Sequence, residues 1–378
     1  MNERRLLNTF LDLVKIDSPS TEERDVSNYC AGALRSAGCS VEFDTGGKAS
    51  GSNTGNLYAV LDGDIEGSII FTAHMDCISP CEGVKPIIEN DIIHTDGTTV
   101  LGGDDKAGIA AIIEAVRSIS ESKASHPTIK IIFTVQEESG LYGAKSFNTG
   151  DFIDGEHCYV VDTTGKPGTL VIRGSYCYLF SAKFSGKTAH AGIEPEKGIN
   201  AIAAASCAIS KIHEKGGLGR VSKTCTSNIG SIESSNEAHN VVPQDCKIVG
   251  ECRAMSGEEN DKVRQIIESS INEAANEFGA KVEQKWELLY SGFSYDDDDP
   301  IVKAFVKATK ACGFKPNLTE TTGGSDANIF AGKGLSPVVV GIGMMSYHTV
   351  EEYIDVNDIY GVTRILRKLM TSSQAASE

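Results

Sequence analysis

Two adjacent carboxylates, Glu137 and Glu138, follow the apolar segment 129–135 in the sequence IKIIFTVQEESG. In most proteins, two neighbouring acids at such a place form a polar turn at the end of a strand. A hydrolytic metal site offers a second explanation, because it needs one carboxylate that binds metal and another that takes the proton of the attacking water and returns it to the leaving nitrogen. Consecutive side chains of a straight strand point to opposite faces, but a break at Gly140 would let both acids serve one site.

Carboxylates and imidazoles also end or follow three other apolar segments, 68–74, 156–162 and 336–343, and they begin one predicted helix. In open α/β sheets, ligands bind beyond the carboxyl ends of the strands, so side chains at these ends gather at one edge. Besides the two glutamates, the residues concerned are His74, Asp76, Asp104, Asp105, Asp162 and His348.

Each of these residues has a simple structural explanation when it is taken alone. Asp104 can cap a helix, and a lone His348 in a loop is in most proteins a surface residue. Gathered together without cations, the carboxylates would repel one another, raise one another's pKa and destabilise the fold. Two divalent cations would neutralise most of that charge. Imidazole and carboxylate donors suit Zn²⁺, with Co²⁺ or Mn²⁺ as substitutes.

Apolar segments alternate with helical patterns through the first half of the chain. Strands separated by helices predict a mixed, largely parallel sheet flanked by helices, which is an α/β fold. One of the helices is predicted to begin after a capping box formed by Ser20 and Glu23. The predicted strands of this sheet include 68–74, 129–135, 156–162 and 336–343.

The middle of the chain has a different order of elements. A strand is followed by a helix around 198–214, two strands, a second helix and a last strand. This β-α-β-β-α-β order is the split βαβ pattern of a ferredoxin-like domain. The acidic sequence SGFSYDDDDP then marks a boundary. We therefore predict a discontinuous metal-binding catalytic domain at 1–177 and 291–378, with an inserted ferredoxin-like α+β domain at 178–290.

The composition and net charge exclude some classes of protein function. The 378 residues are more than one core of ordinary size needs, and the formal net charge of −17 argues against nucleic-acid binding, which normally requires a basic patch. No window approaches 18 apolar residues, so we expect no membrane span. The N-terminal residues resemble an amphipathic helix rather than a signal peptide, and the eleven scattered cysteines indicate reduced thiols. We therefore predict a cytoplasmic protein.

Several motifs resemble those of one enzyme family. HMD, LGGDDKAG, VQEESGLYGA, VVDTTG and YHTVEEYI are similar to the motifs of the co-catalytic zinc peptidases and deacylases, which include peptidase T, carboxypeptidase G and acetylornithine deacetylase. The likeness extends nearly from end to end, through GKTAHAGIEPEKGINAI and TGGSDANIF. It is closest to peptidase T and its tripeptidase-like relatives.

This resemblance implies a set of metal ligands for two zinc ions in each subunit. One ion would be bound by His74 and Asp162. The other would be bound by Glu138 and His348, and Asp104 would bridge the two ions.

The resemblance also implies the roles of residues that do not bind metal. Glu137 would be the general base that activates a metal-bridging water, and Asp76 would orient His74. The peptide bond between Asp104 and Asp105 would be cis.

Three further residues, His190, Asn240 and Arg253, correspond to positions where relatives bind the carbonyl or carboxylate of the substrate. All three lie in the inserted domain. In many relatives this domain also pairs two subunits, so the resemblance implies a homodimer.

The residue at position 162 bears on the substrate. Deacylases and carboxypeptidases of the family tend to have Glu where this chain has Asp162, whereas aminopeptidases and dipeptidases tend to have Asp. Five acids, Asp76, Asp104, Glu137, Glu138 and Asp162, carry −5 against +4 from two zinc ions, which suits an ammonium group. We therefore predict release of the N-terminal residue from short peptides.

One departure from peptidase T limits this prediction. Peptidase T has an arginine before its GGTD, whereas Thr322 precedes GGSD here, so strict preference for tripeptides does not follow. The main alternative is a metal-dependent deacylase of N-acyl amino acids. A more remote one is a non-catalytic metal-binding protein, which would have no use for a second glutamate that does not bind metal.

Overall fold

The computed structural model of the protein describes residues 1–148, 150 and 155–372. The chain divides into two compact units. The first unit comprises Met1–Arg173, Ser294–Glu320 and Ser325–Glu378, and the second comprises Gly174–Phe293 and Thr321–Gly324.

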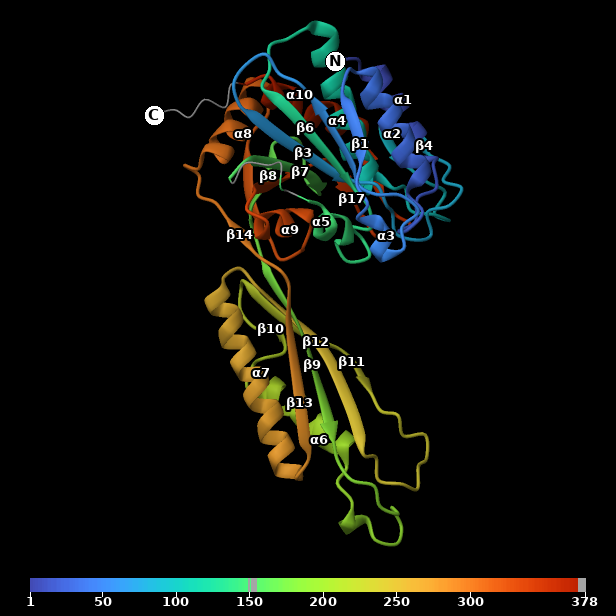
Figure 1. The fold of residues 1–378 in the computed structure, drawn as a ribbon, viewed down its shortest axis with the longest axis vertical. Coiled ribbons are helices and arrows are strands. Elements are labelled where there is room, and N and C mark those ends of the chain that lie inside the picture. Colours follow the sequence, from blue (N-terminus) through green and yellow to red (C-terminus); the bar gives the residue numbers. More distant parts are fainter. Residues whose placement is uncertain (149, 151–154, 373–378) are drawn as a thin grey trace. The chain divides into compact units, whose positions relative to one another are not determined.

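The first unit is built on a nine-stranded sheet whose central strands are parallel (Figure 1). These strands form from continuous apolar runs because both faces of the sheet are covered. In spatial order they are β6 (Thr128–Thr134), β3 (Ser68–His74), β7 (His157–Thr163) and β16 (Ser336–Gly341). Antiparallel β2 (Leu57–Leu61) and β1 (Ser40–Phe43) extend one side, and β8 (Thr169–Gly174), β14 (Phe293–Ser294) and β15 (Asn317–Thr321) extend the other.

Helix α4 (Gly103–Ser122) is the central helix of this unit. It packs against β3 and β7 and against helices α1 (Glu3–Val14) and α10 (Val356–Met370). Its apolar residues are fully buried, because sheet and helices enclose it on several sides. The other helices of the unit are α2 (Arg24–Ser36), α3 (Gly47–Ser50), α5 (Tyr142–Ser146), α8 (Pro300–Ala311) and α9 (Asp326–Gly332).

A small antiparallel sheet supports the loop that carries His348. It contains β17 (Met344–Met345), β18 (Tyr353–Asp355), β5 (Ile92–His94) and β4 (Ile87–Glu89), in that order. His348 lies between β17 and β18. The predicted fold class, a mixed and largely parallel sheet flanked by helices, is confirmed.

The second unit has its own antiparallel sheet, in the order β10-β11-β12-β9-β13. Helices α6 and α7 cover one face, where Phe180, Phe184 and Ile248 meet alanine and isoleucine side chains of the two helices. The unit follows the predicted β-α-β-β-α-β order, with the two-residue strand β10 added. Its elements are β9 (Tyr176–Ser185), η1 (Pro195–Lys197), α6 (Ala201–Glu214), β10 (Gly219–Arg220), β11 (Cys225–Glu233), β12 (Asp245–Ala254), α7 (Gly257–Phe278) and β13 (Lys281–Tyr290).

The short segment Thr321–Gly324 belongs to the second unit although it lies far along the chain from the rest. Hydrogen bonds explain this. The Ser175 N–H donates to the Thr321 carbonyl at 3.2 Å, and the Ser175 hydroxyl donates to the Thr322 carbonyl at 3.0 Å. Arg253 Nη1 donates to the same Thr322 carbonyl at 3.3 Å.

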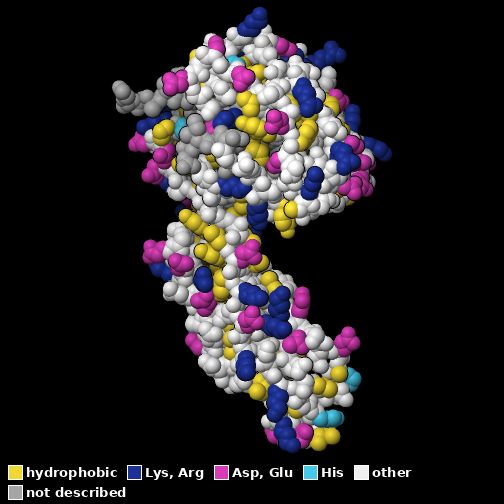
Figure 2. Space-filling model, viewed as in Figure 1, with side chains coloured by type: hydrophobic (Ala, Val, Ile, Leu, Met, Phe, Trp, Pro, Cys, Tyr) yellow, Lys and Arg dark blue, Asp and Glu magenta, His cyan; other side chains and the backbone are white. Residues whose placement is uncertain are grey.

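The surface seen in Figure 2 mixes charges of both signs. Lys and Arg side chains are interspersed with Asp and Glu side chains, so this face presents no broad basic surface of the kind that a phosphate backbone needs. None of the helices in the described part of the chain combines the length and apolar composition needed to cross a bilayer.

Candidate metal centre

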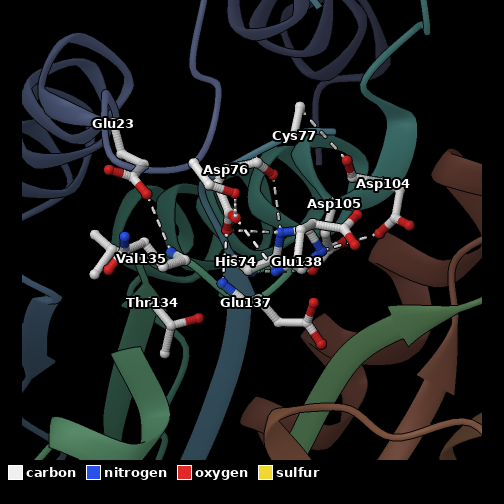
Figure 3. A network of polar contacts seen from close by, with 12 residues as sticks. Glu23, His74, Asp76, Cys77, Asp104, Asp105, Thr134, Val135, Glu137 and Glu138 are labelled. Atoms are coloured by element: carbon white, nitrogen blue, oxygen red, sulfur yellow. Dashed lines mark hydrogen bonds and ion pairs between the residues drawn. The ribbon is translucent and has the colours of Figure 1, made fainter. Parts of the chain in front are cut away.

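The acids and imidazoles singled out from the sequence meet at one edge of the large sheet. Figure 3 shows six of them there: His74, Asp76, Asp104, Asp105, Glu137 and Glu138. His74 is the last residue of β3, and Glu137 and Glu138 follow the neighbouring strand β6. Asp162 lies near the end of β7, which pairs with the other side of β3. Because these strands are parallel, their carboxyl ends share one edge, and Asp104 reaches the same edge from the start of α4.

Asp104 lies between the two imidazoles. Its Oδ1 is 3.0 Å from His74 Nε2, and its Oδ2 is 3.2 Å from His348 Nε2. The His74 Nε2 atom is also 3.8 Å from Asp162 Oδ1, and the His348 Nε2 atom is 2.9 Å from Glu138 Oε1. One carboxylate thus faces an imidazole with each of its oxygens, which is the arrangement expected of a bridging ligand.

The tautomer of His74 follows from its hydrogen bond. Its Nδ1 lies 3.0 Å from the main-chain carbonyl oxygen of Asp76, which can only accept, so Nδ1 carries the proton. A neutral imidazole with its proton on Nδ1 would offer the Nε2 lone pair to a cation on the side of Asp104 and Asp162, where Nε2 otherwise donates to Asp104. The Asp76 carboxylate is farther from the imidazole, with Oδ1 at 3.5 Å from Nδ1, so the main chain of Asp76 is the closer partner.

The buried carboxylate of Asp76 holds the segment that carries the two glutamates. Its Oδ1 accepts the Glu137 N–H at 2.9 Å, and its Oδ2 accepts the Glu138 N–H at 3.2 Å. The Ser20 hydroxyl donates to Oδ2 at 2.6 Å. Asp76 therefore orients the main chain of both glutamates as well as His74.

The predicted capping box of Ser20 and Glu23 is wrong. Helix α2 begins at Arg24, and its N-cap residue Glu23 makes no side-chain capping hydrogen bond. The Ser20 hydroxyl binds Asp76 instead. The buried Glu23 carboxylate accepts hydrogen bonds from the Gln136 N–H and the Ser52 hydroxyl. The spacing matches that of a helix cap, but both side chains instead form hydrogen bonds with residues in or near the loops at the strand ends.

The two glutamates lie in different surroundings. Glu138 pairs with His348, whereas the Glu137 carboxylate makes no hydrogen bond or ion pair with any residue that the structure describes. The strand's alternation ends one residue before them, at Gln136, whose φ is +52°. Figure 3 shows their side chains leaving the main chain in different directions.

Burial shifts the pKa of several acids at this edge of the sheet. It raises the pKa of Asp162 well above its usual range; His74 opposes the shift, while repulsion from Asp104 and Glu138 adds to it. Burial likewise raises the pKa of Glu137. Burial also opposes the ionisation of Asp104, but hydrogen bonds from His348 and His74 lower its pKa overall.

These properties fit a metal centre. One ligand atom each from His74, Asp104 and Glu138 lie within 4.8 Å of one another, and the same holds for His74, Asp105 and Asp162. Divalent cations would relieve the repulsion among the buried carboxylates, and the mixed imidazole and carboxylate donors suit such ions.

Comparison with known proteins identifies the family. The model of peptidase family M20/M25/M40 matches residues 70–372, which is most of the chain. The chain belongs to this peptidase family. The resemblance inferred from the motifs is therefore confirmed, and the protein is a metallopeptidase.

Relatives of this metallopeptidase match it over nearly its whole length. The uncharacterized protein YqjE of Bacillus subtilis is 39% identical over 360 residues, which are 95% of each chain. The crystal structure of aminopeptidase PepT from Bacillus cereus is 34% identical, covers 98% of both chains and has a TM-score of 0.90. A tripeptidase structure from Staphylococcus aureus is also 34% identical, with the same coverage and a TM-score of 0.91.

Two buried acids of this M20 peptidase, Asp105 and Asp326, were predicted neither to bind metal nor to act in catalysis. Asp105 Oδ2 accepts the His74 N–H at 3.3 Å, and its Oδ1 accepts the Gly108 N–H at 3.2 Å. The predicted cis peptide between Asp104 and Asp105 is confirmed. Asp326, at the start of α9, accepts the hydroxyl of Thr134 at 2.5 Å. The motif TGGSDANIF signalled Asp326, but nothing in its spacing predicted that contact.

The three residues predicted to bind substrate all lie in the second unit of the peptidase. The Ala191 N–H donates to the Asn240 carbonyl at 3.0 Å, so His190 and Asn240 lie on adjoining segments. His190 Nδ1 accepts the Gly192 N–H at 3.2 Å, which leaves the proton of a neutral ring on Nε2. Arg253 pairs with Glu251 at 2.9 Å and also binds the Thr322 carbonyl. Their role towards substrate stays a prediction.

Proposed function

We propose that this protein is a di-zinc aminopeptidase that releases the N-terminal residue of short peptides, in the manner of a tripeptidase. The observation that carries this proposal is the unequal setting of the two adjacent glutamates. Glu138 belongs to the ligand group and faces His348, whereas the Glu137 carboxylate has no partner among the described residues. A pure metal-binding protein has no need of such a carboxylate, but a hydrolase needs one to move protons.

The acids and imidazoles of the site could bind two divalent ions. His74 and Asp162 would hold one, Glu138 and His348 would hold the other, and Asp104 would bridge them, as its two oxygens at 3.0 and 3.2 Å from the two imidazoles suggest. When bound, two zinc ions supply Lewis acidity that polarises a peptide carbonyl and acidifies water.

The chain's own residues supply the proton transfers. Glu137 takes a proton from the attacking water and returns it to the nitrogen of the departing peptide. Asp76 keeps Glu137 in place through the main-chain hydrogen bond of 2.9 Å. His190 presents its Nε2–H as a donor for the carbonyl oxygen of the scissile bond, with Asn240 and Arg253 as further substrate ligands.

The substrate class is supported by the relatives and by charge. Solved structures that are 34% identical to this chain are described as an aminopeptidase and a tripeptidase. The five carboxylates of the site outnumber the charge of two zinc ions by one, so the site favours a peptide's ammonium terminus over a blocked amine.

A paired assay separates this function from the deacylase alternative. We expect the zinc-loaded enzyme to release alanine from trialanine faster than from dialanine, and to show little turnover of N-acetylated alanine peptides. The measurement is free alanine released per enzyme and time for each substrate. Preference for the acetylated compounds would assign the chain to the deacylases and overturn the substrate argument, while leaving the metal centre intact.

We also propose that the enzyme is a cytoplasmic homodimer paired through residues 178–290, which would serve as a lid and dimerisation domain. Strand β13 ends the order of its sheet and pairs only with β9 in the described part of the chain, so its outer edge is available for pairing. Sedimentation equilibrium at micromolar concentration is expected to give twice the mass of one chain. A monomer under these conditions would refute the dimer without affecting the chemistry.

A further inference from the structure

A buried glutamate links the loop of His348 to the start of α4. Glu352 lies four residues after His348, and only 2% of its surface is exposed. Its Oε2 accepts the Gly102 N–H at 2.8 Å, and its Oε1 accepts the Asp104 N–H at 2.9 Å. One carboxylate therefore ties together two segments that are about 250 residues apart in the sequence and that carry two of the proposed ligands.

The glycines of LGGDD fit this contact. A Cβ on Gly103 would lie 2.9 Å from Glu352 Oε1, and its next neighbours would be 3.8 Å away. Gly102 has a φ of +74° and donates its own N–H to the carboxylate. A larger residue at position 103 would push Glu352 away from the main chain of Asp104. The two glycines thus leave room for the close approach of the glutamate.

Apart from the contacts of His348 itself and of Glu352, the other side-chain hydrogen bonds described for this loop lie within the loop. The side chain of His348 is 48% exposed, and its main chain is left-handed, with a φ of +62°. Ser346 is left-handed as well, with a φ of +51°, and the Thr349 hydroxyl closes the turn by donating to the Ser346 carbonyl at 2.7 Å. These bonds shape the loop internally, whereas Glu352 attaches it to the segment of Asp104.

We infer that Glu352 is a positioning residue that sets the separation of Asp104 from His348 and thereby the affinity of the ion held by His348 and Glu138. This inference rests on the two-ion centre of the proposed function. His74 and Asp162 reach the site from β3 and β7, whereas the hydrogen bonds of the Glu352 carboxylate in the described part of the chain go to Gly102 and Asp104. Asp104 also belongs to α4, so loss of Glu352 should chiefly release the loop of His348. It should therefore weaken the binding of the ion held by His348 and Glu138 more than that of the ion held by His74 and Asp162.

The test is a zinc titration of the metal-free protein against a competing chromophoric chelator, which needs no substrate. Glu352→Gln keeps the shape of the side chain but replaces one acceptor oxygen with an NH2 group, which cannot accept from N–H. We expect the affinity of one ion to fall about 10- to 100-fold, the range found when a partner that orients a metal ligand is lost, and the other affinity to fall much less. Excess zinc should restore turnover of trialanine.

Glu351→Gln is the matched control, because it removes the same charge from an exposed neighbour. It should bind both ions as the wild type does. Gly103→Ala tests the inference without altering Glu352. The added Cβ would crowd Glu352 Oε1 and would lie no closer than 3.8 Å to the other neighbouring atoms, so the variant is expected to fold and to reproduce the loss of affinity for one ion. In a His348→Ala background, Glu352→Gln should add no further loss, because both changes act on the same ion.

Three results would overturn the inference: unchanged affinities in both Glu352→Gln and Gly103→Ala, an equal loss at both ions, or fewer than two ions bound by the wild type. Peptide turnover is a separate readout. If the single-ion effect appeared but no peptide were cleaved, the positioning role would stand and the proposed peptidase function would fail.

Discussion

Replacement of Glu137 by glutamine is expected to lower kcat for trialanine by about 10²- to 10⁴-fold, the usual contribution of a general base. The physical reason is the loss of the proton acceptor. Glutamine has nearly the same volume and keeps the main-chain N–H that donates to Asp76 at 2.9 Å, so the segment should retain its position. Since Glu137 is not among the proposed ligands, metal analysis should still find two zinc ions per chain.

Two comparisons make this result specific. Glu66→Gln removes the same charge from an exposed position of the first unit and should leave kcat unchanged. Glu138→Gln should instead lower the affinity for one ion, because Glu138 lies 2.9 Å from His348 Nε2. If Glu137→Gln kept both metals and nearly normal turnover, the base would have to be another residue.

The central sheet could be predicted from the sequence because its strands are continuous apolar runs with clear ends. The runs 68–74 and 129–135 correspond within one residue to β3 and β6. Their parallel pairing brings the polar residues that follow to one edge, so much of the metal centre could be predicted before any contact was known. Residue type at a strand end was the useful signal.

Contacts between distant segments could not be predicted in this way. Ser20 and Glu23 have the spacing of a helix cap, and nothing local shows that Ser20 binds Asp76 instead. Glu352 belongs to a motif that was recognised, but its partners lie about 250 residues away. Periodicity describes the face of a helix or strand and contains no information on which loop a side chain will meet.

The limits of the second unit show the same restriction. Composition marks the acidic stretch near residue 295, but it does not show that Thr321–Gly324 joins the second unit. That assignment depends on hydrogen bonds from Ser175 and Arg253 to two main-chain carbonyls. Main-chain acceptors are present at every residue, so such contacts leave no trace in residue type.

Replacement of Asp104 by asparagine is expected to weaken the binding of both ions, whereas replacement of His348 by alanine is expected to weaken the binding of only one. The difference follows from geometry. Asp104 faces His74 with one oxygen at 3.0 Å and His348 with the other at 3.2 Å, so its charge serves both positions. His348 Nε2 contacts only Glu138 and Asp104 Oδ2 within ion-pair distance in the described part of the chain.

Zinc content after dialysis and affinity by chelator competition measure this difference. Asp104→Asn should lower both affinities by more than about 100-fold, beyond the effect of losing a residue that only orients a ligand, and should abolish turnover at ordinary zinc concentration. His213→Ala, at an exposed position of α6, is the control for loss of a histidine. Two ions bound with wild-type affinity by Asp104→Asn would refute the bridge. Two ions bound with wild-type affinity by His348→Ala would refute the ligand role of His348. A loss of affinity for both ions in Asp104→Asn but for only one ion in His348→Ala would therefore distinguish a bridged pair of ions from two independent sites.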